Sequence, residues 1–250
     1  MISVRKNKFD FKNSNKYYYK DSKLITHFFN ALSSTFPPGE DFFVRAVRKH
    51  RKPLQDDLER DISGFIGQEA WHSQAHKTMN IYAETHNIPL TKIEDFINTA
   101  LKLIESKLTA KQCLAVTVAL EHYTASMGME ILNNKKWLKH FEEPYKELIK
   151  WHSSEEIEHR HVAYDVYMRD YSDDYKTRVM VMIGASVIFW VAISIMTGML
   201  FISDKDMTPV EKTKELTKGL FKLIGPNGFV TNILKDVPIF FKKDFHPNIM

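Results

Sequence analysis

The sequence predicts an all-α protein, built on a four-helix bundle with extra helices and one long apolar helix. Two stretches contain Glu-x-x-His, as Glu69/His72 and as Glu156/His159, and residues three apart lie on one side of an α-helix, about one turn apart. Apolar residues recur at helical spacing in several other segments. Residues 179–203 form a run without a charged side chain. Together these features favour helices rather than strands.

The two Glu-x-x-His pairs predict a dinuclear metal site. In the carboxylate sites of four-helix bundles, two helices each supply Glu-x-x-His and two others each supply a lone Glu. The chain offers Glu40 and Glu121 as the lone glutamates. Four carboxylates and two imidazoles therefore form the candidate ligand set.

Composition limits the class of protein and of site. A chain of 250 residues forms one large domain, or one domain with an appendage. The single cysteine, Cys113, cannot form an intramolecular disulfide, which indicates a reducing compartment and excludes a cysteine-based zinc site. The 11 histidines favour a site of imidazoles and carboxylates. With a net charge of only +4, we expect the basic stretches to be solvated surface, with no nucleic acid as partner.

The first predicted helix begins after a basic, irregular N-terminal segment that lacks the apolar core of a secretory signal. Asp21 or Ser22 is suited to cap this helix. Pro37 and Pro38 are expected to end it, with another helix starting just before Glu40. Glu40 then lies in a first helical turn, where a carboxylate also complements the helix dipole without any metal.

A second helix is predicted over residues 56–86. Glu69, His72 and His76 lie on one side of it, because steps of three, four and seven residues return to nearly the same angle. Aromatic residues flank this cluster, which indicates that it faces inward. We therefore add His76 to the candidate metal ligands.

The next predicted helices cover residues 91–107 and, after a Thr109 cap, residues 110–132. Glu121 lies in the middle of the second one, directly after a run without charge. A buried carboxylate without a partner costs several kcal/mol. A metal ion and a salt bridge explain Glu121 equally well.

The helix predicted over residues 144–171 carries the densest group of ligand-type residues. One side of it presents His152, Glu155, Glu156 and His159. Glu158 and His161 form a second, overlapping Glu-x-x-His, and spacing alone does not decide between the pairs. We choose Glu156/His159 because it lies closest to the line through His152, and we expect His152 and Glu155 to be catalytic or ligand-orienting groups. An ion-paired helix surface is the alternative.

Val179–Ser203 is long enough to cross a bilayer as one helix. A buried helix and an apolar dimer interface are the alternatives, and a hairpin would keep both flanks on one side. The flanking charges favour a cytoplasmic metal domain anchored to the inner face of the membrane. We divide the chain into an irregular N-terminus (1–20), the di-metal bundle (21–175), the apolar helix (176–204) and an amphipathic tail (205–250).

These motifs together resemble a bacterial family labelled "predicted metal-dependent hydrolase" and, through it, the ferritin-like di-metal carboxylate proteins. The resemblance spans residues 36–247. It rests on Phe36-Pro37-Pro38-Gly39-Glu40, Gln68-Glu69-x-x-His72-x-x-x-His76, Leu120-Glu121-His122, the cluster at 152–159 and Phe245-His246-Pro247. It implies a ferritin-like bundle that binds two metals through Glu40, Glu69, His72, Glu121, Glu156 and His159.

Three functions follow as hypotheses. The first is an O₂-activating oxidase or oxygenase with two metal ions, either two irons or manganese with iron; zinc or manganese would be the ions of the hydrolase given second. It would act on a small, apolar substrate with electrons from a separate donor. The second is a metal-dependent hydrolase that uses an activated water, with Glu155 or Glu158 as general base. The third is a non-enzymatic metal-binding or structural membrane protein. Helical packing makes a homodimer a reasonable expectation for each.

Overall fold

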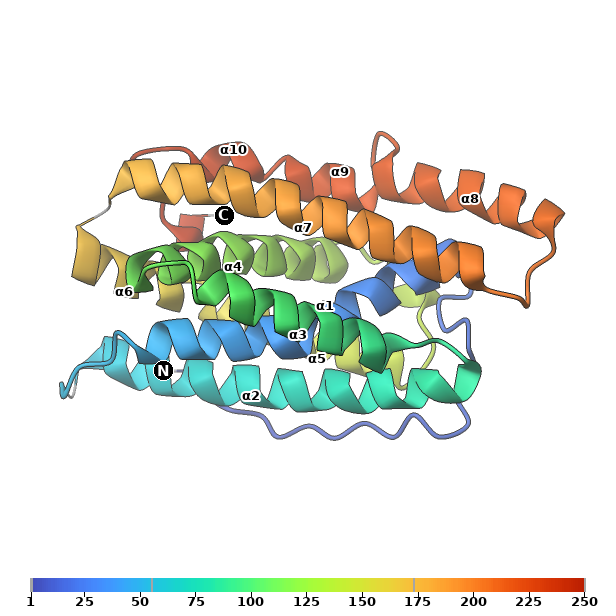
Figure 1. The fold of residues 1–250 in the computed structure, drawn as a ribbon, viewed down its shortest axis with the longest axis horizontal. Coiled ribbons are helices and arrows are strands. Elements are labelled where there is room, and N and C mark those ends of the chain that lie inside the picture. The colour runs from blue at the N-terminus through green and yellow to red at the C-terminus, as the bar shows by residue number, and fades with distance from the viewer. Residues whose placement is uncertain (1, 55, 173, 250) are drawn as a thin grey trace.

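The computed structural model describes residues 2–54, 56–172 and 174–249, and these residues confirm the all-α prediction with one long apolar helix. The helices run mostly along one long axis (Figure 1). Their bounds are α1 Lys23–Arg48, α2 Asp57–Ala83, α3 Leu90–Glu105, α4 Ala110–Asn133, α5 Tyr145–His159, α6 Val162–Tyr171, α7 Tyr175–Ser203, α8 Pro209–Ile224, α9 Phe229–Leu234 and α10 Val237–Phe240.

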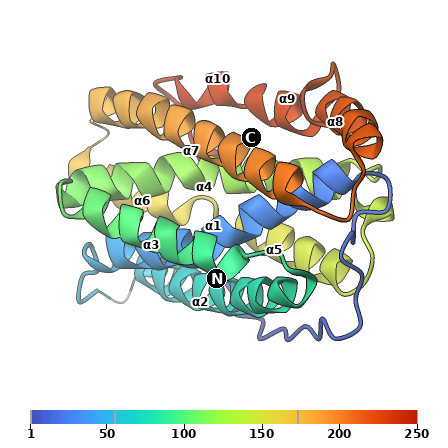
Figure 2. The same cartoon turned by 45° about the vertical axis from the view of Figure 1, so that its right-hand side comes forward.

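Four of these helices form a bundle. Helix α1 packs against α2 and α4, and α5 packs against α4 and α2, so the contacts close a ring. Helix α3 covers α1 and α2, while α7 lies over α1 and α4 (Figure 1, Figure 2). Apolar side chains such as Ile25, Phe65, Leu114 and Leu148 are buried inside the ring. Their burial is the main force that holds the four helices together.

The helix break predicted at Pro37 and Pro38 is wrong, because α1 runs through both prolines without interruption. Pro37 has no N–H to donate to the carbonyl of Ser33, one turn earlier. The side-chain amide of Asn80 on α2 donates to that carbonyl instead, at 3.1 Å. The continuous helix buries Glu40 in the protein interior, whereas the sequence predicted a first turn.

Other helix ends agree with the prediction, with one exception. Ser22 rather than Asp21 caps α1, since its Oγ accepts the N–H of Ile25 at 3.4 Å, and Thr109 forms a capping box at the start of α4. The helix predicted over residues 144–171 is wrong in its continuity, because a turn at residues 160–161 divides it into α5 and α6. No glycine or proline marks that turn, so periodicity alone could not reveal it.

The N-terminal segment lies along the outside of the bundle beside α2 (Figure 1). Two glycines of α2 make this close approach possible: a Cβ at Gly64 would meet Ile2 at 2.6 Å, and one at Gly67 would meet Val4 at 2.5 Å. The Gln68 side chain donates to the carbonyl of Ser3 at 3.0 Å. The segment is thereby fixed over the middle of α2, next to the Glu-x-x-His pair.

Helix α7 packs lengthwise on the bundle with one face and exposes the other. It is long and apolar enough to cross a membrane, and its most apolar window has a mean hydropathy of 2.4 with 11% of it buried. Its exposed residues form an apolar stripe, here called the α7 stripe, of Met180, Ile183, Val187, Val191, Ile195, Met199 and Ile202. A buried core helix would not show such a stripe.

The segment after α7 returns to the same bundle. Helix α8 packs against α1, and α9 packs against α4. In the part of the chain that the structure describes, α7 therefore does not separate the C-terminal segment from the residues before it. The four-part division of the chain stays a prediction.

Asp204 connects the end of α7 to the N-terminal segment. Its carboxylate accepts hydrogen bonds from Lys16 at 2.7 Å, Tyr17 at 2.8 Å and His27 at 2.9 Å. Burial opposes the charge, but these donors hold the pKa of Asp204 well below its usual value. Because the pKa of Asp204 is lower in the folded protein, its carboxylate adds to the free energy of unfolding at any pH above its unfolded pKa of about 3.9. This contribution decreases as the pH falls below that value.

We expect Asp204→Asn to lower the free energy of unfolding by about 3 kcal/mol at pH 7, because it leaves buried donors without their charged acceptor. Urea denaturation followed by circular dichroism measures this. Asp206→Asn is the matched control, since Asp206 also pairs with Lys16 but is 65% exposed, and we expect a change of about 0.5 kcal/mol or less. Equal effects of the two substitutions would contradict a buried role for Asp204.

Candidate metal centre

Seven ligand-type side chains from four helices meet inside the bundle. They are Glu40 from α1, Glu69 and His72 from α2, Glu121 from α4, and His152, Glu156 and His159 from α5, and all are buried. Their ligand atoms form two groups, in each of which the atoms lie within 4.8 Å of one another.

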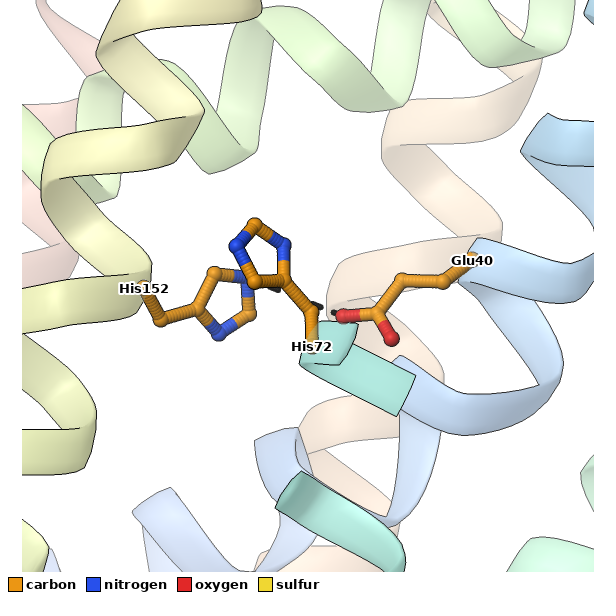
Figure 3. A group of neighbouring side chains, drawn as sticks. All are labelled: Glu40, His72 and His152. Carbon is orange, nitrogen blue, oxygen red and sulfur yellow. Dashed lines mark ion pairs between the residues drawn. The ribbon is translucent and has the colours of Figure 1, made fainter. Parts of the chain in front are cut away.

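The first group consists of Glu40, His72 and His152. Figure 3 shows the three side chains converging from three helices, with the Glu40 carboxylate directed toward both imidazoles. The Nε2 atom of His152 lies 3.6 Å from Oε1 of Glu40. One carboxylate and two imidazoles thus surround one point.

The second group consists of Glu69, Glu121, Glu156 and His159. The Nε2 atom of His159 lies 3.0 Å from Glu69, 3.4 Å from Glu121 and 3.6 Å from Glu156. Three carboxylates therefore surround one imidazole nitrogen.

Glu156 links the two groups. Its Oε2 faces His159 in the second group. Its Oε1 lies 2.8 Å from Nε2 of His152 and 3.3 Å from Nδ1 of His72, both in the first group. This carboxylate is thus placed to contact an ion in either group.

The hydrogen bonds around the imidazoles leave one nitrogen of each free to face the centre. His72 donates from Nε2 to Glu155 at 2.9 Å, so Nδ1 is left to face Glu156. Gln68 donates with its amide nitrogen to Ser3, so its oxygen accepts from Nδ1 of His159 at 2.9 Å and Nε2 faces the carboxylates. The second hydrogen bond of a metal-binding imidazole fixes its tautomer in this way.

His152 is fixed by a longer chain of hydrogen bonds. The Asn80 amide nitrogen donates to the Ser33 carbonyl, so the Asn80 oxygen accepts from the Ser33 hydroxyl at 2.7 Å. Nδ1 of His76 then donates to that hydroxyl at 2.9 Å, and Nε2 of His76 accepts from Nδ1 of His152 at 2.8 Å. Nε2 of His152 faces Glu40 and forms a hydrogen bond with Oε1 of Glu156 at 2.8 Å; a metal ion bound there would take the place of the proton on this nitrogen.

The donor atoms of the centre fit a pair of cations. Among the described residues, no hydrogen bond reaches either oxygen of Glu40, Glu69 or Glu121. Buried carboxylates are strongly unfavourable without compensating positive charge, and the nearest polar groups that face them are the imidazoles of His72, His152 and His159. Metal ions would satisfy both kinds of atom, and oxygen-rich sets with imidazole suit iron and manganese.

The ionisation of these groups without metal agrees with this interpretation. Burial, and then the charges of Glu69 and Glu156, raise the pKa of Glu40 well above its usual value. Burial opposes charge on His159, but Glu156, Glu121 and Glu69 raise its pKa well above the usual value. Protons thus supply the positive charge that the carboxylates require, and metal ions would take their place.

The structure brings most, but not all, of the predicted site residues together. His76 belongs to neither group, since both of its ring nitrogens are used by Ser33 and His152. His152, predicted as a catalytic or orienting group, lies in the first group with Glu40 and His72. Both oxygens of Glu155 are bonded, to Trp151 at 2.9 Å and to His72 at 2.9 Å, which fits an orienting group rather than a base.

The overlapping pair Glu158/His161 lies outside the centre. Glu158 pairs with Arg5, and His161 lies 3.5 Å from Asp61. Sequence reasoning missed three supporting residues: Gln68, Ser33 and Arg5, which donates to Glu155 at 2.6 Å. Gln68 directly precedes Glu69 in its motif, but no sequence signal marks Ser33 or Arg5.

We expect Glu155→Ala to weaken metal binding about 10–100-fold, because it releases the orientation of His72. Glu155→Gln keeps an acceptor for His72 and should restore most of the affinity. Titration of the metal-free protein against a competing chelator measures both. If Glu155→Ala weakened metal binding no more than Glu158→Ala does, Glu155 would not act through His72.

An apolar cavity of about 350 Å³ reaches the centre from the side of α7. Helices α1, α3, α4 and α7 supply most of its walls, and Glu40 and Glu156 lie among the lining residues. The remaining polar side chains of the lining are Thr35 and Thr124. Two candidate ligands thus face an otherwise apolar space.

Comparison with known proteins yields one family. A family model described as "Predicted metal-dependent hydrolase" matches residues 3–250. No curated protein and no solved structure matches the chain. The match includes every residue of the two ligand groups.

Proposed function

Since the chain belongs to the family of predicted metal-dependent hydrolases, we propose that it is a dinuclear metal enzyme, and that its reaction is the oxidation of an apolar substrate by O₂. The observation that carries the proposal is the arrangement of the ligands. A lone Glu on α1, a lone Glu on α4, and a Glu-x-x-His pair on each of α2 and α5 face one another inside a bundle. This is the arrangement of the ferritin-like di-iron and di-manganese proteins.

The proposed oxidation balances with O₂ and an external electron donor. One C–H bond of the substrate breaks and one C–O bond forms. The second oxygen atom leaves as water, and a separate donor supplies two electrons and two protons. Iron, or manganese with iron, bound by this oxygen-rich ligand set would supply the redox chemistry.

Residues around the centre orient the candidate metal ligands and keep water away from them. Glu155, Gln68 and His76 orient the three imidazoles through the hydrogen bonds described above. The apolar walls of the cavity exclude water from the carboxylates of Glu40 and Glu156, and exclusion of water limits side reactions. The same walls favour a substrate without charge.

Hydrolysis is the second candidate, and the description of the family favours it. Bound zinc or manganese ions would then activate a water for attack on a polar bond. The cavity supports this less well than oxidation, because its lining offers only two threonines to orient a polar group. If the protein is a hydrolase, the metal ions and their ligands would have to orient the polar bond of the substrate with little help from the cavity walls.

Elemental analysis with an optical spectrum before and after reduction and exposure to air tests the proposal. We expect about two ions per chain, with iron present, and an absorption band that changes with reduction and air. Two zinc ions without a redox response would overturn the oxidase in favour of the hydrolase. A protein that takes up no metal on reconstitution would refute both.

A further inference from the structure

The apolar cavity opens to the surface between α3 and α7. Ile104 of α3 and Ile188 of α7 line the cavity and are also 37% and 62% exposed. The buried part of the cavity contains Glu40 and Glu156. A molecule that enters between the two helices therefore reaches the metal centre directly.

The lining of the cavity selects an uncharged chain. Among the described lining residues, the only charged side chains are the two candidate ligands. A charged headgroup inside the cavity would find no partner and would be unfavourable there. Small residues of α7, namely Gly184, Ala185 and Ala192, give the cavity its width. The site accommodates an alkyl chain and leaves a polar end outside.

The opening lies in an exposed apolar surface. Helices α3 and α7 are neighbours on one side of the molecule (Figure 1, Figure 2). The α7 stripe is exposed on one side of the opening, and Phe96 and Leu103 of α3 are exposed on the other. Large exposed apolar surfaces mark contacts with membranes or other proteins.

Helix α8 favours a membrane as the occupant of this surface. It exposes Leu216, Leu220 and Phe221, and its sequence carries lysines at positions 212, 214, 218 and 222. A helix with an exposed apolar face and lysines beside it is typical of proteins that lie in the membrane interface. Helix α8 follows α7, whose residues 179–203 carry no charge, and together the two helices indicate a face that rests in the bilayer rather than one that pairs with a second copy.

We propose that the substrate of this metal centre is a lipid with a single long alkyl chain, of the fatty acyl type. It leaves the bilayer chain-first through the opening between α3 and α7. This inference rests on the proposed function, because it names the substrate class of the same centre. The chain end, or a carbon near it, then lies beside Glu40 and Glu156.

Gly184 and Gly198 provide a matched pair of variants. Both lie on α7, and a Cβ added at either position meets no atom within 4 Å. Gly184 lines the cavity, whereas Gly198 is not among its lining residues. Leucine also favours a helix over glycine, so both variants should fold. Gly184→Leu fills the cavity and Gly198→Leu does not.

The first experiment measures binding of cis-parinaric acid, a fluorescent long-chain fatty acid, to the metal-loaded protein. We expect binding to the parent protein and to Gly198→Leu, and at least a tenfold loss for Gly184→Leu. Metal content and thermal unfolding of each variant show that the fold and the centre are intact. Equal binding by the two variants, or no binding by the parent protein, would overturn the proposal.

The second experiment measures flotation of the full chain with vesicles of phosphatidylcholine and phosphatidylglycerol. We expect the parent protein to float and a Val187→Glu/Val191→Glu variant to stay in the dense fraction. Neither valine lines the cavity, so the variant should still bind the fatty acid in solution. A parent protein that stays in the dense fraction as a dimer would overturn the membrane route and assign the face to a second copy.

These outcomes separate this inference from the proposed function. An iron protein that reacts with O₂ but binds no fatty acid would refute the lipid substrate and leave the oxidase standing. Binding that depends on Gly184 in a zinc protein without redox response would refute the oxidase and leave a lipid-binding site.

Discussion

Replacing Glu156 with alanine will remove both metal ions from the protein. Glu156 is the carboxylate that faces both groups, with Oε1 2.8 Å from His152 and Oε2 3.6 Å from His159. The substitution removes one candidate ligand from each ion. It also removes the only side chain that faces both groups among the candidate ligands described above. We expect metal content to fall from about two ions per chain to about zero, together with loss of the absorption band. Elemental analysis of protein reconstituted under nitrogen measures this.

Two further substitutions make the result specific. Glu158→Ala changes a carboxylate two residues away that pairs with Arg5 and accepts from Gln68 at 3.1 Å but belongs to neither ligand group, and we expect it to keep about two ions, since Gln68 still donates to Ser3. Glu40→Ala affects only the first group and should keep about one ion. Metal loss from Glu158→Ala with retention by Glu156→Ala would move the site to the overlapping Glu158/His161 pair. Circular dichroism confirms that each variant is folded.

The sequence could predict the candidate ligands that local helix geometry brings together. Glu69 and His72, and Glu156 and His159, are three residues apart, and any α-helix places such pairs on one side. The structure brings both pairs into the two groups. The helices themselves follow from apolar periodicity and caps, as at Thr109. These features depend only on residues within one or two turns.

The features that depend on contacts between helices could not be predicted. Pro37 signals a helix end, but α1 continues and buries Glu40, and the amide of Asn80 on another helix donates to the Ser33 carbonyl that Pro37 leaves without a backbone partner. His76 and His152 are both suitable ligands by spacing. The structure places His152 and not His76 in one of the two ligand groups, because Ser33 and His152 take up both nitrogens of His76. Spacing along one chain contains no information about such partners.

Replacing Glu121 with glutamine will have opposite effects on the metal-free and the metal-loaded protein. Burial raises the pKa of Glu121 to about 8, although His159 opposes the shift. In the unfolded chain the pKa is about 4.3. Since the folded state binds the proton more tightly, the metal-free protein loses stability as the pH rises from about 4.3 to about 8.

Glutamine does not ionise in either state, so Glu121→Gln removes this loss. At pH 7 we expect the metal-free variant to be more stable by up to about 3.5 kcal/mol, with a melting temperature higher by up to about 7–14 °C for a chain of this size. The metal-loaded variant should instead melt at a lower temperature than the loaded parent protein, because weaker binding removes the stabilisation that a bound ion provides. Thermal unfolding with chelator, and with iron under nitrogen, measures both effects.

Glu105→Gln is the control for the sign of this effect. Burial opposes the charge of Glu105, but Arg45 and Lys49 lower its pKa. This carboxylate therefore stabilises the protein at pH 7, and its replacement should lower stability slightly, with or without metal. If Glu121→Gln lowered the stability of the metal-free protein as well, Glu121 would be a salt-bridge partner of His159. A gain in stability without metal and a loss with it are expected only of a carboxylate that is kept buried to bind a cation.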